Sequence, residues 1–308
     1  MPVDIHSQVL VPAEPVSATP VKSREPAPDA TEKARHERNL ALILPREHGA
    51  WGLLLVPMAT AAGVAFRQSA NVFPFVLLLT AALALFWVRT PFESLLGIAA
   101  MRAETKEERS AVAFVTGYLA TIAAIALSML LWAGRNPGLW IIGVAVGAAF
   151  VGQALLRRLG RRTRMLSEIV GTIGLTSAAP AVYYVITGKL GVTACMLWLA
   201  NFIFAGNQIH YVQLRIHTAR VVGFRAKLAR GWAFASGQLI MTALLATTCV
   251  LGWMSWIVLI AFAPLVLRGF YYFVQGPAPL VVRRLGWNEL AQAIVFCVLF
   301  ITTFALSV

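Results

Sequence analysis

The feature that most constrains this chain is a repeated pattern of long, uninterrupted apolar runs. Each run is long enough to cross a hydrocarbon core of about 30 Å as a helix. The runs lack the two-residue alternation of barrel strands, which leaves helices as the structure that spans the lipid. The sequence therefore predicts an all-α, polytopic transmembrane helical bundle of about nine spans, at residues 50–66, 72–89, 111–132, 138–156, 168–187, 190–211, 233–252, 253–272 and 288–307.

The composition agrees with a membrane protein and excludes an ordinary soluble domain. Of the 308 residues, 59% are hydrophobic and 13% are charged, whereas soluble domains carry about 25% charged residues. Membrane topology and attraction to anionic lipid head groups account for the net charge of +13, so no nucleic-acid partner is expected. Cys195, Cys249 and Cys297 lie within predicted spans without paired spacing, which argues against a disulfide framework or a zinc site.

The distribution of basic residues predicts the orientation of the bundle. All 26 Lys and Arg residues except Arg67, Arg135 and Lys189 fall in the N-terminal tail, in alternate loops on the same side, or in the span ends next to those loops. Loops on the cytoplasmic side carry such an excess of Lys and Arg. We therefore expect a cytoplasmic N-terminus, a C-terminus outside the cell, and polar chemistry at the cytoplasmic ends of the spans.

The N-terminal segment differs in composition from the rest of the chain. Residues 1–44 contain six prolines, mixed charge and few large apolar residues, which is typical of disorder. The sequence therefore predicts a disordered cytoplasmic tail over 1–44 and a transmembrane helical domain over 45–308.

The junction after the second span carries a helix-start signal. Thr90 is followed by Pro91 at the first helical position and by Glu93 three residues after the cap. This pattern predicts a second helix after the span, with a kink or break near Pro91. If the helix is continuous instead, Arg89 and Glu93 are four residues apart and able to pair.

Glycines and turn residues give further expectations about helix ends and packing. A turn at residues 251–253 divides the seventh and eighth predicted spans. Gly143 and Gly147 in the fourth span, and Gly171 and Gly174 in the fifth, are small enough to permit close helix contact.

Polar residues near the predicted cytoplasmic face are the candidates for a functional site. Some have simpler explanations: Glu47 and Glu168 suit a helix N-terminus, and Arg89 suits the positive side of the membrane. Polar groups at the end of the sixth span are costly unless they face a cavity or a partner. The candidates are Arg46, Glu47, His48, Arg89, Glu93, Glu168, Asn207, His210, Gln213, Arg215 and His217.

The sequence does not favour a metal-dependent mechanism. Asp4 and Asp29 are the only aspartates, and both lie in the tail. An aspartate cluster that holds magnesium on a diphosphate is therefore excluded. His210 and His217 are two helical turns apart, about 10 Å along the axis, which is too far to share one ion. No metal site is predicted, and no particular cofactor is indicated.

The stretch PREHGAWGLLLVP at residues 45–57 resembles the signature of the YwiC-like family of bacterial membrane proteins. This resemblance implies a protein of the bacterial cytoplasmic (inner) membrane but no particular reaction. The nine-span layout is also similar to the UbiA prenyltransferase superfamily, which implies two pseudo-symmetric halves and a cytoplasm-facing cavity. The motifs of that superfamily, of NDxxDxxxD and DxxxD type, follow the second and sixth spans, where this chain has polar residues but no aspartates.

These observations lead to one hypothesis and two alternatives. Arg46, Glu47, His48 and the other candidates line a cavity that binds, and in an enzyme modifies, an isoprenoid or quinone-like lipid. His48 or Glu168 would then transfer protons. The first alternative is a membrane transporter or a non-catalytic membrane subunit, since buried Glu and His also serve proton coupling. The second is that the polar residues only hold helices together.

Overall fold

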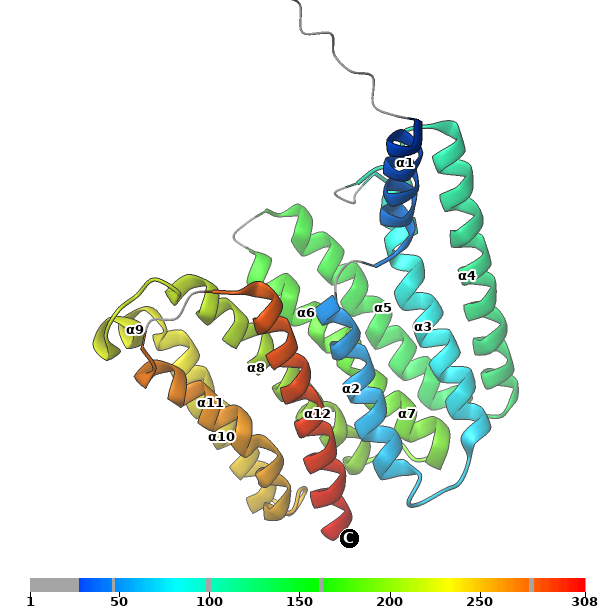
Figure 1. Ribbon diagram of the computed structural model, residues 1–308. Helices are drawn as coiled ribbons and strands as arrows, with labels where there is room; N and C mark the ends of the chain where they lie inside the picture. The colour runs from blue at the N-terminus through cyan, green and yellow to red at the C-terminus, as the bar shows by residue number, and fades with distance from the viewer. Residues whose placement is uncertain (1–27, 46–47, 98–100, 161–162, 277–279, 308) are drawn as a thin grey trace, which may run out of the picture. The chain divides into compact units, whose positions relative to one another are not determined.

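The computed structural model describes residues 28–45, 48–97, 101–160, 163–276 and 280–307, and these residues are predominantly helical (Figure 1). The chain divides after Leu40 into two units. In chain order the helices are α1 (Pro28–Ile43), α2 (His48–Ala65), α3 (Val72–Leu95), α4 (Lys106–Trp132), α5 (Asn136–Arg158), α6 (Arg164–Thr176), α7 (Ala178–Thr187), α8 (Val192–Thr218), α9 (Phe224–Arg230), α10 (Trp232–Val250), the 3-10 helix η2 (Trp256–Phe262), α11 (Ala263–Val274) and α12 (Val282–Leu306).

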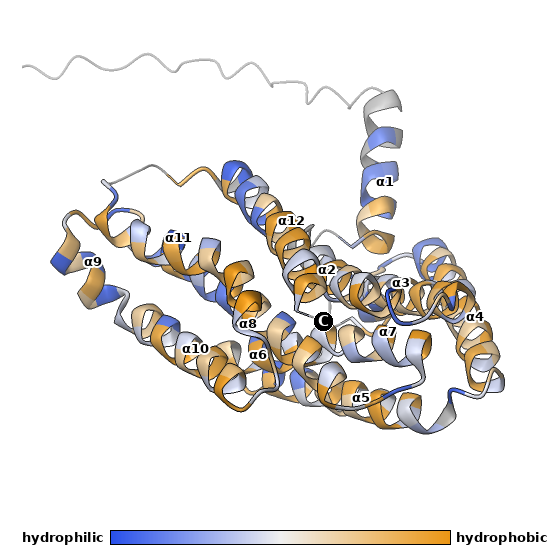
Figure 2. Ribbon diagram, turned by 90° about the horizontal axis from the view of Figure 1, so that it is seen from below, coloured by the Kyte–Doolittle hydropathy of each residue, from blue (hydrophilic) through white to orange (hydrophobic). Residues whose placement is uncertain are grey.

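The predicted helical bundle is confirmed. Among the described residues, eight helical segments are long and apolar enough to cross a membrane, and α2 contributes a shorter apolar helix over Trp51–Ala65. Together they occupy the nine expected runs. Figure 2 shows hydrophobic residues along the spans, and hydrophilic residues at the first turns of α12 and on α9. Large apolar side chains exposed on the spans, such as Ile141, Val144 and Leu239, suit contact with lipid.

The described part of the tail differs from the expectation of disorder. Residues Pro28–Ile43 form α1, and the preceding residues lie outside the described part of the chain. The segment after Pro28 is rich in Ala, Glu, Lys and Arg, which have high helix propensity. Within residues 1–44, all the prolines lie at Pro28 or before it. The average composition of the tail therefore does not describe the segment after Pro28.

The predicted helix start at Thr90 is wrong, because α3 continues through Pro91 to Leu95. Proline removes a single donor from a helix that is otherwise bonded. The helix start lies further along, at Thr105, whose side chain accepts a hydrogen bond from the backbone N–H of Glu108 while the Glu108 side chain accepts one from the N–H of Thr105. This capping box begins α4.

The predicted turn between the seventh and eighth spans is confirmed. The α10 helix ends at Val250, Gly252 has a φ of 71°, and the next span begins as the 3-10 helix η2 before it continues as α11. A positive φ is easily adopted by glycine. The fifth span is also divided, because α6 ends at Thr176 and α7 begins at Ala178.

Only two of the four glycines expected at helix contacts lie close to another helix. A Cβ at Gly171 of α6 would overlap Gln153 of α5, and one at Gly174 would touch the Ala149 Cβ at 3.4 Å. The close contact expected there is confirmed. At Gly143 and Gly147 a Cβ would meet nothing within 4 Å among the described residues, so the expected contact is not made within the chain.

The main hydrophobic core is formed by residues of α2, α3, α4, α7, α8, α10, η2, α11 and α12. At its centre Phe296 of α12 stacks on Phe204 of α8, with ring centroids 4.1 Å apart. A buried polar contact joins α2 to α8, where Asn201 Nδ2 donates to Thr60 Oγ1 at 2.9 Å. These two contacts hold α8 against α12 and α2. The loops that contain most of the basic residues join the spans at one end of the bundle, which we call the basic end (Figure 1).

Candidate functional site

The predicted site residues occupy separate places at the basic end. Arg46 and Glu47 lie outside the described residues. His48 begins α2, and its side chain is likewise outside the described part. The remaining candidates divide among a contact between α3 and α5, a contact between α6 and α8, and two faces of α8.

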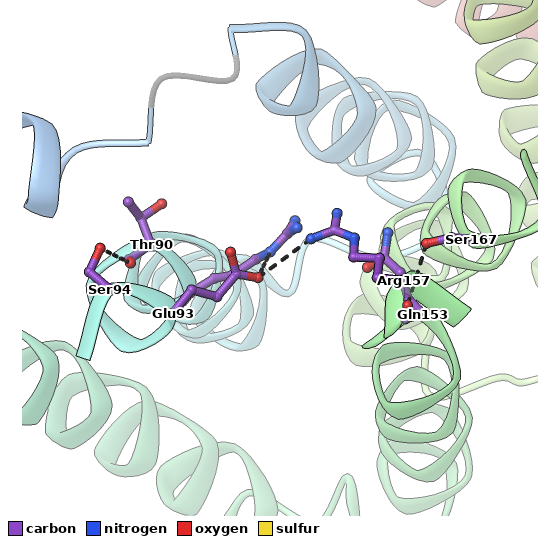
Figure 3. Close-up of polar contacts among 7 residues, drawn as sticks. Thr90, Glu93, Ser94, Gln153, Arg157 and Ser167 are labelled. Atoms are coloured by element: carbon purple, nitrogen blue, oxygen red, sulfur yellow. Dashed lines mark hydrogen bonds and ion pairs between the residues drawn. The ribbon is translucent and has the colours of Figure 1, made fainter. Parts of the chain in front are cut away.

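Arg89, Glu93 and Arg157 form the first polar contact. The Nε atom of Arg89 donates to Oε1 of Glu93 at 3.0 Å, as the continuous helix requires. Arg157 of α5 brings its Nη1 to 3.7 Å from the same oxygen, and Figure 3 shows its side chain directed toward Glu93. The contact links α3 to α5, and Arg157 is half exposed, so its contribution to stability is small.

Glu168 lies in a contact between α6 and α8. Gln213 Nε2 donates to Oε2 of Glu168 at 2.5 Å. The preceding residue, Ser167, is buried, and its Oγ donates to the backbone carbonyl of Gln153 at 3.4 Å (Figure 3). Two of the predicted residues are therefore brought together, on helices that also place Gln153 and Arg157 of α5 nearby.

The polar residues at the end of α8 do not share one environment. Asn207 is buried and its Nδ2 donates to the sulfur of Met241 at 3.6 Å. His210 is half-buried against Phe234 of α10, with ring centroids 5.8 Å apart. His217 is exposed and contacts the carbonyl of Gln213 on its own helix. The face expected to unite these residues is thus divided between α10 and solvent.

A pocket of about 480 Å³ opens between α8, α11 and α12 at the basic end. Its polar lining includes three arginines and two tyrosines, and its aliphatic lining lies along α12. Of the predicted site residues, Arg215 alone lines it among those that are described. The lining residues are Tyr211, Arg215, Arg268, Tyr271, Gln275, Val281, Arg284, Leu285, Asn288, Ala291, Gln292 and Val295.

The inner part of this pocket is built around the ion pair of Arg268 and Glu289. The Nη1 atom of Arg268 donates to Oε1 of Glu289 at 2.7 Å, and the two side chains are 14% and 13% exposed. The guanidinium lies 3.9 Å from the ring centroid of Tyr211, a favourable cation–π distance. Gln208 Nε2 donates to the Glu289 carbonyl at 3.1 Å, which ties α8 to α12.

Several polar atoms of this pair are buried without a hydrogen-bond partner among the described residues. They are Nε and Nη2 of Arg268 and Oε2 of Glu289, and Oε1 of Gln292 is in the same condition. Buried polar groups are normally bonded, and leaving them unpaired is costly. These atoms can be satisfied by water or by a polar ligand in the pocket.

Lys227 of α9 and Tyr272 of α11 contact two residues of the pocket lining, Gln275 and Arg215. Arg215 and Lys227 lie over the Tyr272 ring, at 4.9 and 4.7 Å from its centroid. Lys227 Nζ donates to the Gln275 carbonyl at 2.7 Å, at the end of α11. Burial, and then the charge of Arg215, lower the pKa of Lys227. Burial is the larger of the two causes, and Arg215 adds a repulsion between like charges.

Sequence reasoning missed Arg268, Glu289 and Tyr211 as site residues. Arg268 was counted only as a basic residue of a cytoplasmic loop, although it lies within the span Trp256–Val274. Glu289 offered a clear signal, because it is the only acidic residue after Glu168 and lies within an apolar run. An ionisable residue inside a span points to function or to a buried partner.

These features define a polytopic helical membrane protein with a polar pocket at the basic end of its bundle. The family model described as YwiC-like protein matches residues 44–183. The resemblance expected from residues 45–57 is confirmed. The match ends within α7, so the pocket lies beyond it. No curated protein matches the chain.

Proposed function

We propose that this protein binds a membrane lipid of the isoprenoid or quinone-like class in the pocket between α8, α11 and α12. The observation that carries the proposal is the pocket itself, with a polar outer part and an aliphatic wall. Its volume of about 480 Å³ lies within the range of about 300–1,000 Å³ typical of small-molecule sites. The distance along α12 from Arg284 to Val295 is about 16 Å, which suits an elongated amphiphile.

The orientation proposed for the site places the pocket toward the cytoplasm. The loops at the basic end carry most of the Lys and Arg residues, and such loops are typical of the cytoplasmic side. A bacterial inner membrane, a cytoplasmic N-terminus and an external C-terminus remain our predictions. A lipid would enter from the bilayer with its head group at the cytoplasmic surface.

A reaction on the bound lipid is part of the proposal, with proton transfer assigned to Glu168 or His48. Glu168 accepts a hydrogen bond from Gln213 at the α6–α8 contact and does not line the pocket between α8, α11 and α12, so its proton transfer to a lipid remains a prediction from the sequence. The similarity to the UbiA superfamily and its pseudo-symmetric halves likewise remains a prediction. Chemistry of that kind would have to proceed without the aspartate motifs, which this sequence lacks.

Filling the pocket tests the proposal. In Ala291→Trp, an indole enters the lipid path along α12, so we expect the isoprenoid or quinone-like lipid that copurifies with the protein to fall at least about tenfold, equivalent to about 1.4 kcal/mol. Mass spectrometry of lipids extracted from the purified protein measures this. The matched control is Ile294→Trp, which places the same side chain on the same helix at a position that does not line the pocket. Equal lipid profiles in the wild type and Ala291→Trp would contradict the proposal.

A transporter is the second candidate function, and the largely buried Glu289 within a span favours it. Its carboxylate is 13% exposed, and carboxylates within spans can serve proton coupling. Movement of the lipid between leaflets of reconstituted vesicles would identify a transporter. Binding without such movement favours a binding protein or an enzyme.

A further inference from the structure

The pocket between α8, α11 and α12 has an excess of positive charge. Its described lining contains Arg215, Arg268 and Arg284 but no carboxylate. Among the described residues, the acid next to this lining is Glu289, which pairs with Arg268. No ion pair to Arg215 or Arg284 is found among the described residues, so three arginine charges face one carboxylate there and the site is positive.

The three arginines lie at two depths. Arg284 is near the start of α12 and Arg215 is near the end of α8, so both lie at the outer part of the pocket. Arg268 lies further from the basic end, near the middle of α11. Because Nε and Nη2 of Arg268 have no bonding partner within the described structure, the deepest of the three cations retains donors that can reach a ligand.

We propose that the pocket recognises an anionic head group of the phosphate class, with Arg215 and Arg284 at its outer part and Arg268 below. This inference rests on the proposed lipid-binding function and specifies the head group. A guanidinium group presents paired N–H donors that match the oxygens of phosphate. An uncharged quinone or alcohol head would leave the buried donors of Arg268 without an anionic partner, which is unfavourable.

Glu289 has a defined part in this recognition. Its carboxylate occupies Nη1 of Arg268 and leaves the other donors unbonded within the described residues. It thereby holds the guanidinium against Tyr211 at 3.9 Å and fixes the orientation of the remaining N–H groups. Glu289 is therefore a positioning residue, and the bound anion would satisfy the donors that Glu289 does not reach.

The experiment measures equilibrium binding of radiolabelled dodecyl phosphate to the purified full-length chain in an uncharged maltoside detergent. Dodecanol and inorganic phosphate serve as competitors. We expect dodecyl phosphate to bind at least about tenfold more tightly than dodecanol, because hydrogen bonds between a guanidinium and a phosphate are stronger than those to a neutral hydroxyl. Arg284→Gln should weaken dodecyl phosphate binding by about tenfold.

The matched control is Arg283→Gln, which removes the same charge from the neighbouring residue. Arg283 is exposed and does not line the pocket, so its loss should leave binding within about twofold, well below the tenfold effect of a charged hydrogen bond. For the inner arginine, Arg268→Gln combined with Glu289→Gln avoids leaving one buried charge alone. This variant should also weaken binding of dodecyl phosphate but not of dodecanol.

The outcomes separate the head-group inference from the proposed function. If dodecanol competes as well as dodecyl phosphate, the phosphate inference is wrong and lipid binding stands. If inorganic phosphate competes as well as dodecyl phosphate, the proposal of an anion site is supported and the proposal of lipid binding is wrong. Absence of dodecyl phosphate binding, or an equal effect of Arg283→Gln and Arg284→Gln, would also overturn the inference.

Discussion

Replacing Arg268 with methionine is expected to lower the free energy of unfolding by about 3 kcal/mol, the lower end of the range for breaking a buried ion pair. The change leaves the Glu289 carboxylate, which is 13% exposed, without its cationic partner. It also removes the guanidinium from the Tyr211 ring, which it contacts at 3.9 Å from the centroid. Reversible unfolding in mixed micelles, followed by circular dichroism, measures the loss.

Two controls distinguish a buried pair from a surface pair. Arg268→Met combined with Glu289→Leu removes both charges and should recover most of the loss, since an apolar replacement of a buried pair is often neutral. Arg157→Met breaks the 3.7 Å contact with Glu93, where Arg157 is 46% exposed, and should cost no more than about 0.5 kcal/mol. Equal losses for Arg268→Met and Arg157→Met would show that the Arg268 pair is not desolvated.

Replacing Phe296 with alanine is expected to destabilise the bundle by about 3–5 kcal/mol. Phe296 is fully buried, stacks on Phe204 of α8 and contacts Phe262 of η2, with centroids 4.1 and 5.2 Å apart. Helices in lipid associate largely through packing, so a cavity here weakens the contacts that hold α12 to α8. The same unfolding measurement quantifies the effect.

The matched position for Phe296 is Val298, two residues along the same helix. Val298 is 55% exposed on α12, and Val298→Ala should stay within about 0.5 kcal/mol of the wild type. Dodecyl phosphate binding should weaken in Phe296→Ala, because the pocket depends on the position of α12. Stability unchanged by Phe296→Ala would contradict the packing described for α8, η2 and α12.

The spans were predictable because the apolar runs are continuous and their lengths match the membrane. The turn at Gly252 was also predictable, since glycine and aromatic residues interrupt the run there. The helix start at Thr90 was not, because the local signal competes with a helix that already extends from Val72. The helix propensity of residues near a proline does not show whether packing against neighbouring helices keeps the helix continuous through it.

The site was predicted less completely than the fold. Arg89 with Glu93 followed from their spacing on one helix, whereas Glu168 with Gln213 depends on the packing of α6 against α8. The pair of Arg268 and Glu289 joins two helices that are separated by a loop. Only the placement of α11 beside α12 reveals it, and hydropathy does not specify which spans are neighbours.

The most direct test of the account is photo-crosslinking of the purified protein with an alkyl phosphate that carries a diazirine in its chain. Peptide mapping by mass spectrometry then locates the labelled residues. The account predicts labelling concentrated on α12 around Ala291 and Val295, and on the facing parts of α8 and α11, with loss of this labelling in Ala291→Trp. Labelling spread evenly over lipid-facing helices such as α5, and unchanged in Ala291→Trp, would contradict a ligand pocket at the basic end.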